Sequence, residues 1–263
     1  QNPTSLITSK FIRIFPPYWL ALAMFIFIMG YSLKRLDLWV YLLNLQFIFS
    51  PAFAKQLLTL WYISMFVAYY TIFGTLIFRT RSNIQLLAWS GFIFIAAYIL
   101  HSMTKLLDPR FFQYFFVFLA GIYFSRFEQF RVRLFDLPFL YKVGLAVLGV
   151  IFFWLVKIAG YEMTHGLRIL AVNFYMLAWV LVWLTIFRTK LGSWRIWSFI
   201  STASFFAYLY HRPFWEILIS IFKPGNWRDE TLFKFLPGSI MVLFVCYLLQ
   251  IGYDRLLALL RQR

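Results

Sequence analysis

The sequence predicts an all-α integral membrane protein, a polytopic bundle of about eight spanning helices. Two observations lead to this fold class. Of the 263 residues, 63% are hydrophobic and only 13% are charged, whereas a soluble domain carries about 25% charged residues. The apolar residues also fall in continuous runs of about 20, the length that crosses a bilayer as a helix. Such runs are too long for the alternating strands of a membrane barrel.

The predicted spans follow one another along the whole chain with short polar connections. Each must be helical, because the bilayer core offers the backbone no water for hydrogen bonding. We expect them at residues 16–33, 57–78, 84–102, 110–126, 140–159, 167–187, 197–222 and 234–258. A further stretch, 37–49, is too short to span and is expected to be interfacial or re-entrant. No loop is long enough for a soluble domain, so residues 1–263 are expected to form one transmembrane domain.

The net charge of +16 does not point to nucleic acid. Lys and Arg lie in short clusters between the apolar runs, as the positive-inside rule describes, and they favour anionic membrane lipids as partners. An even number of spans puts both ends on one side. With both ends in the cytoplasm, 14 Lys and Arg lie inside and 10 outside, and Arg212 lies within a span. We therefore expect a multi-pass inner (plasma) membrane protein. The single cysteine, Cys246, allows no disulfide framework or thiol–metal cluster, and no metal site is expected.

Ionisable residues inside one predicted span indicate a functional site, because such groups are costly in a membrane. The segment ASFFAYLYHRPFWEILIS, residues 203–220, holds Tyr208, His211, Arg212 and Glu216. A polar residue recurs every four positions from Ser204, which places the series on one helix face. Arg212 and Glu216 are expected to pair.

Pro213 in the same span cannot donate a hydrogen bond to the carbonyl of Leu209, so it should kink the helix. The freed carbonyl needs a polar partner, and we therefore expect this helix to face a wet cavity. The alternative is that Arg212 and Glu216 only join helices, with His211 as a buried hydrogen-bonding residue.

Two further segments carry candidate residues. LWYIS, residues 60–64, places Trp61, Tyr62 and Ser64 near the end of a span, either as part of an interfacial aromatic belt or as a second polar set that meets His211 in the outer half of the membrane. KFIRIFPPYW, residues 10–19, places Lys10 and Arg13 one helical turn apart. On charge alone this pair is either a membrane anchor or an anion-binding rim.

Four segments, in order, resemble motifs of the acyltransferase 3 family of membrane acyltransferases. KFIRIFPPYW resembles its [RK]xxR-[IL]-[YF]-P-x-[YF]-W motif, and LWYIS its LW[FY][LI]S motif. FFVFLAGIYFSR resembles its FxxGxxxxR helix around Gly121, and SFFAYLYHRPFW its S[YF]xxYLxHxP segment. Together they cover nearly the whole chain.

The resemblance implies an enzyme that moves an acyl group, often acetyl, from a coenzyme A thioester to a hydroxyl. The implied acceptors are surface polysaccharides, modified by O-acetylation, or lipid-linked glycans. It implies that Lys10 and Arg13 contact acyl-CoA, which is a co-substrate with no bound cofactor. Trp61, Tyr62, Ser64, Tyr208, His211, Arg212 and Glu216 would then shape the cavity on the acceptor side. The alternative is a transporter or flippase for a polyprenyl-linked glycan, with proton coupling through Glu216.

Two departures from the family pattern qualify these expectations. The family has about ten spans, and its first helix carries a histidine regarded as the catalytic base, for which this sequence has no counterpart. The chain is therefore expected to be N-terminally truncated, with its catalytic histidine outside this sequence, and inactive as a fragment. Phe66 also stands where many members have a glutamate. Glycan-modifying branches of the family often lack this glutamate, so its absence marks a branch but leaves the acceptor open.

Overall fold

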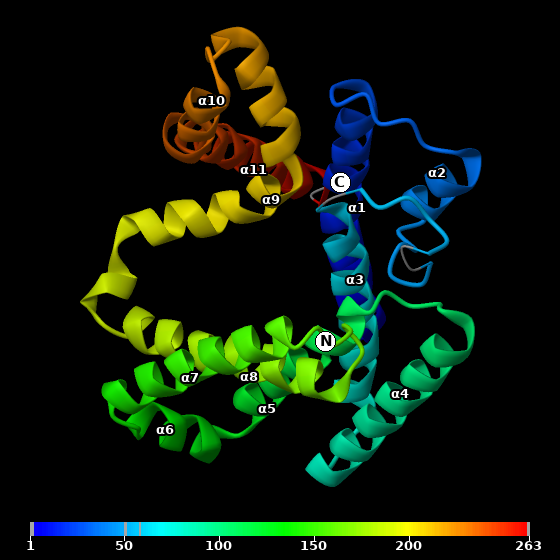
Figure 1. The fold of residues 1–263 in the computed structure, drawn as a ribbon, viewed down its shortest axis with the longest axis vertical. Coiled ribbons are helices and arrows are strands. Elements are labelled where there is room, and N and C mark those ends of the chain that lie inside the picture. The colour runs from blue at the N-terminus through cyan, green and yellow to red at the C-terminus, as the bar shows by residue number, and fades with distance from the viewer. Residues whose placement is uncertain (1–2, 50–51, 58, 262–263) are drawn as a thin grey trace. The chain divides into compact units, whose positions relative to one another are not determined.

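The computed structural model shows a protein built of helices (Figure 1). It describes residues 3–49, 52–57 and 59–261, with the side chains of residues 3–10 and 261 outside the description. No strand occurs among these described residues, so the predicted all-α fold class is confirmed. The helices are α1 (Pro3–Phe27), α2 (Arg35–Leu42), α3 (Leu60–Arg79), α4 (Asn83–Thr104), α5 (Arg110–Arg126), α6 (Glu128–Asp136), α7 (Phe139–Ile158), α8 (Gly166–Phe187), the 3₁₀-helix η1 (Lys190–Ser193), α9 (Arg195–Phe222), α10 (Trp227–Phe233), the π-helix η2 (Lys234–Gly238) and α11 (Ser239–Arg261).

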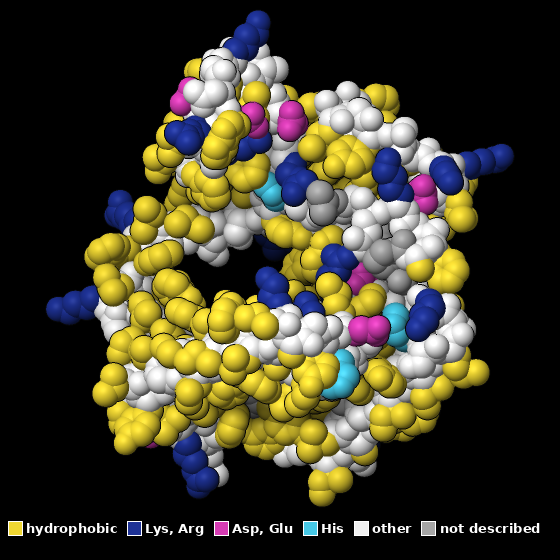
Figure 2. Space-filling model, viewed as in Figure 1, with side chains coloured by type: hydrophobic (Ala, Val, Ile, Leu, Met, Phe, Trp, Pro, Cys, Tyr) yellow, Lys and Arg dark blue, Asp and Glu magenta, His cyan; other side chains and the backbone are white. Residues whose placement is uncertain are grey.

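Length and apolarity identify a multi-pass membrane protein. Among the described residues, five helical segments are long and apolar enough to cross a membrane, namely α3, α4, α7, α8 and the continuous stretch Trp227–Leu260, and Phe11–Phe27 is a shorter apolar helix. Hydrophobic side chains cover much of the face shown in Figure 2, as lipid contact requires. The predicted number of about eight is not confirmed. α5 has only 17 residues, and α9 carries the charged residues that lower its hydropathy.

The chain forms two compact units. The first comprises Gln1–Ile7, Leu43–Gln56 and Ser64–Gly192, and the second comprises Thr8–Leu42, Leu57–Ile63 and Ser193–Arg263. The boundary therefore falls inside α3. The second unit brings together three regions far apart in the sequence, because α1, the start of α3 and α9 to α11 all belong to it.

Helices α7 and α8 lie side by side in the first unit (Figure 1). Small residues allow this close approach. Ala146 and Ala178 belong to the buried core, and a Cβ added to Gly149 would lie 2.9 Å from the Cα of Tyr175. Because that distance is shorter than real side-chain contacts, glycine is the residue that fits at this crossing.

An aromatic core joins α3 to α5 in the same unit. The ring of Tyr69 stacks on Phe111 and Phe118, with centroids 5.2 and 4.3 Å apart. Its hydroxyl donates to the carbonyl of Phe111. Since Phe115 and Phe73 extend the cluster, the middle of α3 is held by large apolar contacts and one buried hydrogen bond.

The double proline of α1 frees a carbonyl that α11 satisfies within the second unit. In a helix the carbonyl of Ile12 accepts from residue 16, or from residue 17 in π geometry, but both are prolines without an N–H. The hydroxyl of Tyr253 donates to the Ile12 oxygen instead, at 2.8 Å. The prolines therefore create a docking point for α11.

Replacing Tyr253 with phenylalanine should lower the stability of the second unit. The exposed Ile12 carbonyl would lose its protein donor where neither proline can replace it, at a cost of about 0.5–1.5 kcal/mol. Thermal unfolding in detergent measures the effect, and Tyr141→Phe is the matched control, because Tyr141 is 68% exposed. Equal unfolding midpoints for the two variants would contradict this role.

Helix α9 bends as its proline predicts. Figure 1 shows it changing direction between its yellow and orange parts, and Pro213 lies inside this helix. The buried face of α9 includes Phe206 and Tyr210. Phe206 packs against Tyr253 of α11, with ring centroids 5.7 Å apart. The kinked helix is thereby fixed to α11 on one side.

Candidate functional site

Two of the polar segments singled out in the sequence meet in the second unit. The Tyr208 hydroxyl of α9 donates to the carbonyl of Thr59, just before α3, at 2.6 Å. The rings of Tyr62 and Tyr208 lie 5.2 Å apart, and Trp61 contacts Tyr62 edge-on at 5.9 Å. The first turn of α3 and the middle of α9 thus form one aromatic and polar cluster.

His211 sits in this cluster with its tautomer determined by the backbone. Its Nδ1 lies 3.0 Å from the carbonyl oxygens of both Ala207 and Tyr208. Carbonyls only accept hydrogen bonds, so Nδ1 carries the proton and Nε2 is left as an acceptor. The ring is half-buried and perpendicular to Trp215, with centroids 4.9 Å apart. His211 can therefore receive a hydrogen bond from a hydroxyl in a defined direction.

The cluster contains two more polar residues that the sequence did not indicate. The Oγ1 of Thr59 and the Nε1 of Trp215 are buried and have no hydrogen-bond partner among the residues that the structure describes. Thr59 also has φ of +83°, which is an outlier for a β-branched residue. Backbone strain of this kind concentrates at functional sites. Trp215 lies in the same motif as His211, but no sequence pattern signals a positive φ at Thr59.

A chain of hydrogen bonds connects the proline motif of α1 to this cluster. The Tyr18 hydroxyl donates to the carbonyl of Tyr41 in α2 at 2.7 Å. The Tyr41 hydroxyl in turn accepts from the backbone N–H of Leu57 at 2.6 Å, two residues before Thr59. On another side of α1, the buried Tyr210 hydroxyl donates to the Pro17 carbonyl at 2.8 Å. Hydrogen bonds within the second unit thus join α1 to α9 directly and link both helices to the residues just before α3.

The cationic pair of the first motif is only partly described. The side chain of Lys10 lies outside the described residues. Arg13 forms an ion pair with Asp254 of α11, Nη2 to Oδ1 at 3.0 Å, and the two side chains are 51% and 41% exposed. An exposed pair of this kind contributes only about 0–1 kcal/mol. The guanidinium is therefore accessible and weakly held.

The expected pairing of Arg212 with Glu216 is wrong. Among the described residues neither takes part in an ion pair, and Glu216 is exposed while Arg212 is half-buried. The order along the helix gives a physical reason, because an acid preceding a base by four residues is the favourable arrangement and here the base comes first. The polar stripe runs along the more open side of α9, opposite its buried Phe206 and Tyr210.

Ser64 has a local structural contact. Its hydroxyl donates to the carbonyl of Asn44 at 2.6 Å and accepts from the N–H of Phe47 at 3.1 Å. These bonds hold the loop that follows α2 against α3 within the first unit. Of the predicted cavity residues, Ser64 alone belongs to that unit, while Trp61, Tyr62, Tyr208, His211, Arg212 and Glu216 all belong to the second.

The helices and the site define a multi-pass membrane protein with a polar cluster built around a kinked helix. The sequence model of the acyltransferase 3 family, described as an acyltransferase domain, matches residues 1–251. The chain therefore belongs to the acyltransferase 3 family and is a membrane acyltransferase. No curated protein matches it. No solved structure matches it either.

Proposed function

We propose that this acyltransferase moves an acyl group, acetyl by preference, from acyl-CoA to a hydroxyl of a cell-surface or lipid-linked glycan. The observation that carries the proposal is the His211 cluster, in which a ring held by its Nδ1 contacts Trp215, whose buried indole N–H has no hydrogen-bond partner among the described residues. Acyl transfer to a hydroxyl needs both kinds of group. We place the protein in the plasma membrane with both ends in the cytoplasm, where acyl-CoA is found.

We assign the donor to the rim around Arg13. A guanidinium binds phosphate oxygens through two parallel charge-assisted hydrogen bonds. Arg13 is half exposed, and its bond to Asp254 is weak enough to be exchanged for a phosphate of coenzyme A. Lys10, one turn earlier on α1, supplies a second cation in this assignment.

We assign the acceptor to the cluster. The hydroxyl of the glycan donates to Nε2 of His211 and is thereby aimed at the thioester carbonyl. Attack forms the new C–O bond and places negative charge on the carbonyl oxygen, where the Nε1–H of Trp215 is suited to stabilise it. The intermediate then breaks its C–S bond, and the departing thiolate of coenzyme A takes up the proton that the acceptor hydroxyl gave to Nε2 of His211 during the attack. Aromatic rings of Trp61, Tyr62 and Tyr208 suit the apolar faces of a sugar.

Labelled acetyl-CoA tests this function. Membranes from cells expressing the full-length protein should transfer the label to a membrane glycan, and membranes from cells without it should not. Translocation of a polyprenyl-linked glycan without incorporation of label would contradict the proposal and favour a transporter or flippase.

Replacing Thr59 with glycine separates the effect of the positive φ on stability from the effect of the hydroxyl on acyl transfer. Glycine adopts a positive φ freely, so the variant should be stabilised by about 1 kcal/mol or more. Loss of the buried hydroxyl should at the same time lower label transfer about fivefold. Thr59→Ala is the matched variant, because it removes the hydroxyl and keeps the strained backbone. Full activity in both variants would show that the hydroxyl does not contact the acceptor.

A further inference from the structure

The first unit buries a lysine that forms no ion pair with an acidic residue in the described part of the chain. Lys142 of α7 is only 1% exposed. Its Nζ donates to the carbonyl of Phe135 near the end of α6 at 2.9 Å, and among the described residues no carboxylate forms an ion pair with it. A buried ammonium is costly unless it is compensated. The partial negative charge at the end of a helix amounts to about half a charge and offsets it only in part.

A second cation converges on the same aromatic ring. The guanidinium carbon of Arg188, just after α8, lies 4.2 Å from the centroid of the Phe135 ring, and the Lys142 Nζ lies 5.9 Å from it. The two charges are thus at most about 10 Å apart, one Debye length at 0.1 M salt. Arg188 is exposed. Of the acids on α6, Glu128 pairs with Arg131, and Asp136 has no ion pair among the described residues.

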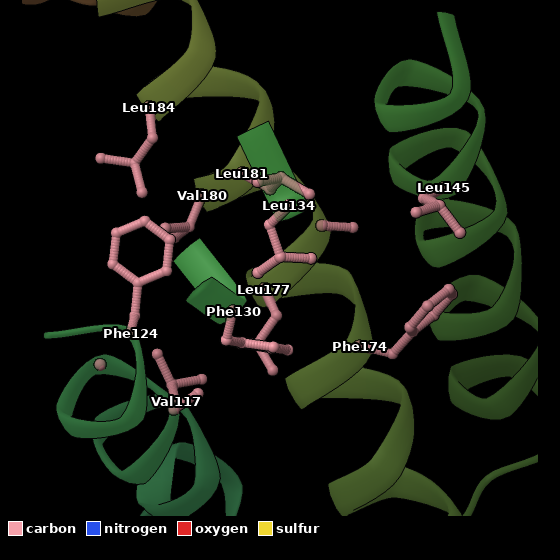
Figure 3. Close-up of a pocket in the computed structure, with 13 residues that line it drawn as sticks. Val117, Phe124, Phe130, Leu134, Leu145, Phe174, Leu177, Val180, Leu181 and Leu184 are labelled. Carbon is pink, nitrogen blue, oxygen red and sulfur yellow. The ribbon is translucent and has the colours of Figure 1, made fainter. Parts of the chain in front are cut away.

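An apolar cavity of about 340 Å³ lies in the same unit (Figure 3). Four helices line it, and all of its side chains are apolar: Val117, Ala120, Gly121 and Phe124 of α5, Phe130 and Leu134 of α6, Leu145 of α7, and Phe174, Leu177, Ala178, Val180, Leu181 and Leu184 of α8. A cavity of about 150 Å³ already admits benzene, so this one has room for a hydrocarbon chain.

Residues that line the cavity are close in sequence to both cations, and part of its edge is exposed. Leu134 precedes Phe135 directly, and Leu184 lies one helical turn before Arg188. Phe130 and Val180, at the edge of the cavity, are 49% and 45% exposed. A Cβ at Gly121 would meet no atom within 4 Å, which leaves this wall of the cavity unfilled.

We propose that this place in the first unit binds an anionic phospholipid of the surrounding leaflet. The phosphate contacts Arg188, and the buried charge of Lys142 strengthens the attraction through a medium of low dielectric. One acyl chain fills the cavity between α5, α6 and α8. A soluble phosphate would leave the apolar cavity empty, and a zwitterionic phospholipid brings its own cation with its phosphate and so adds no net negative charge to compensate the two cations. The predicted topology puts this end of α8 on the cytoplasmic side, where basic pockets between helices favour anionic headgroups.

Native mass spectrometry of the purified protein with phosphatidylglycerol and phosphatidylcholine tests the proposal. Each cation near a headgroup is worth about fivefold in binding, so the wild type should prefer phosphatidylglycerol about thirtyfold. Arg188→Gln should reduce this preference about fivefold. Arg133→Gln is the matched control, because it removes an exposed cation of α6 that does not contact Phe135, and it should keep the preference.

A second variant tests the cavity without changing any charge. Gly121→Leu fills the cavity and replaces a glycine inside a helix, so the fold should not suffer. It should reduce binding of both lipids, with an unchanged or higher thermal unfolding midpoint. Equal binding of the two lipids by the wild type, or unchanged binding in both Arg188→Gln and Gly121→Leu, would overturn the proposal. So would displacement of the lipid by coenzyme A. Lipid binding is measured here without acyl-CoA, so the result does not depend on whether the protein transfers an acyl group as proposed.

Discussion

Replacing His211 with glutamine should lower label transfer to the glycan about a hundredfold, the size of effect expected when a reacting group is misplaced by about 1 Å. The backbone carbonyls of Ala207 and Tyr208 hold Nδ1 and so aim Nε2. The side-chain amide of glutamine cannot both donate to these carbonyls and present an acceptor atom at the position of Nε2. The KM for acyl-CoA should remain unchanged, because His211 is assigned to the acceptor.

The matched control is His165→Gln. His165 precedes α8, where its Nδ1 accepts from the N–H of Leu167 at 3.3 Å, and its side chain is exposed. Its loss removes a helix cap, at a cost of about 0.5–2 kcal/mol of stability, and should leave transfer intact. Equal transfer by the His211 and His165 variants would remove His211 from the reaction.

Replacing Arg13 with alanine should raise the KM for acyl-CoA about tenfold, since hydrogen bonds to charged groups contribute about 1.5–3 kcal/mol. The turnover number should change little once acyl-CoA is saturating. Arg81→Ala is the control, because Arg81 is an exposed cation on the same predicted side of the membrane. An unchanged KM together with altered membrane orientation would identify Arg13 as an anchor.

Asp254 gives this experiment a second arm. Its Oδ1 lies 3.0 Å from Nη2 of Arg13, where a phosphate of acyl-CoA would bind. The negative charge of the carboxylate also repels phosphate. Asp254→Asn should therefore lower the KM for acyl-CoA about two- to fivefold, the range of an exposed ion pair. An equal rise of the KM for acyl-CoA in Arg13→Ala and Asp254→Asn would show that the site requires the intact ion pair. The proposal that a phosphate displaces Asp254 from Arg13 would then be wrong.

Much of the fold could be predicted from local pattern. The apolar runs predicted the long helices, and Pro213 predicted the bend of α9. The contact between Tyr62 and Tyr208 agrees with one of the two interpretations of LWYIS, in which this segment meets the polar residues of span 197–222. Hydropathy alone does not give the number of spans. Helix α5 is short for a span, and helix α9 carries charged residues.

The partners of individual side chains could not be predicted in this way. The Arg212–Glu216 spacing suggested an ion pair that does not form, since spacing places two Cβ atoms near each other without choosing side-chain directions. The positive φ of Thr59 and the unpaired N–H of Trp215 depend on how α3 and α9 pack. Neither has a local sequence signal.

By itself the sequence determined that this chain is a helical membrane protein of the acyltransferase 3 family. The physical reason is that a bilayer removes water from the backbone, so apolar length and helix breakers dictate the secondary structure locally. Only the tertiary structure decided that Arg13 meets Asp254, that Tyr253 satisfies the carbonyl freed by Pro16, and that Lys142 and Arg188 share one ring. Such contacts join residues up to 241 positions apart, and their geometry depends on helix packing that no local pattern encodes.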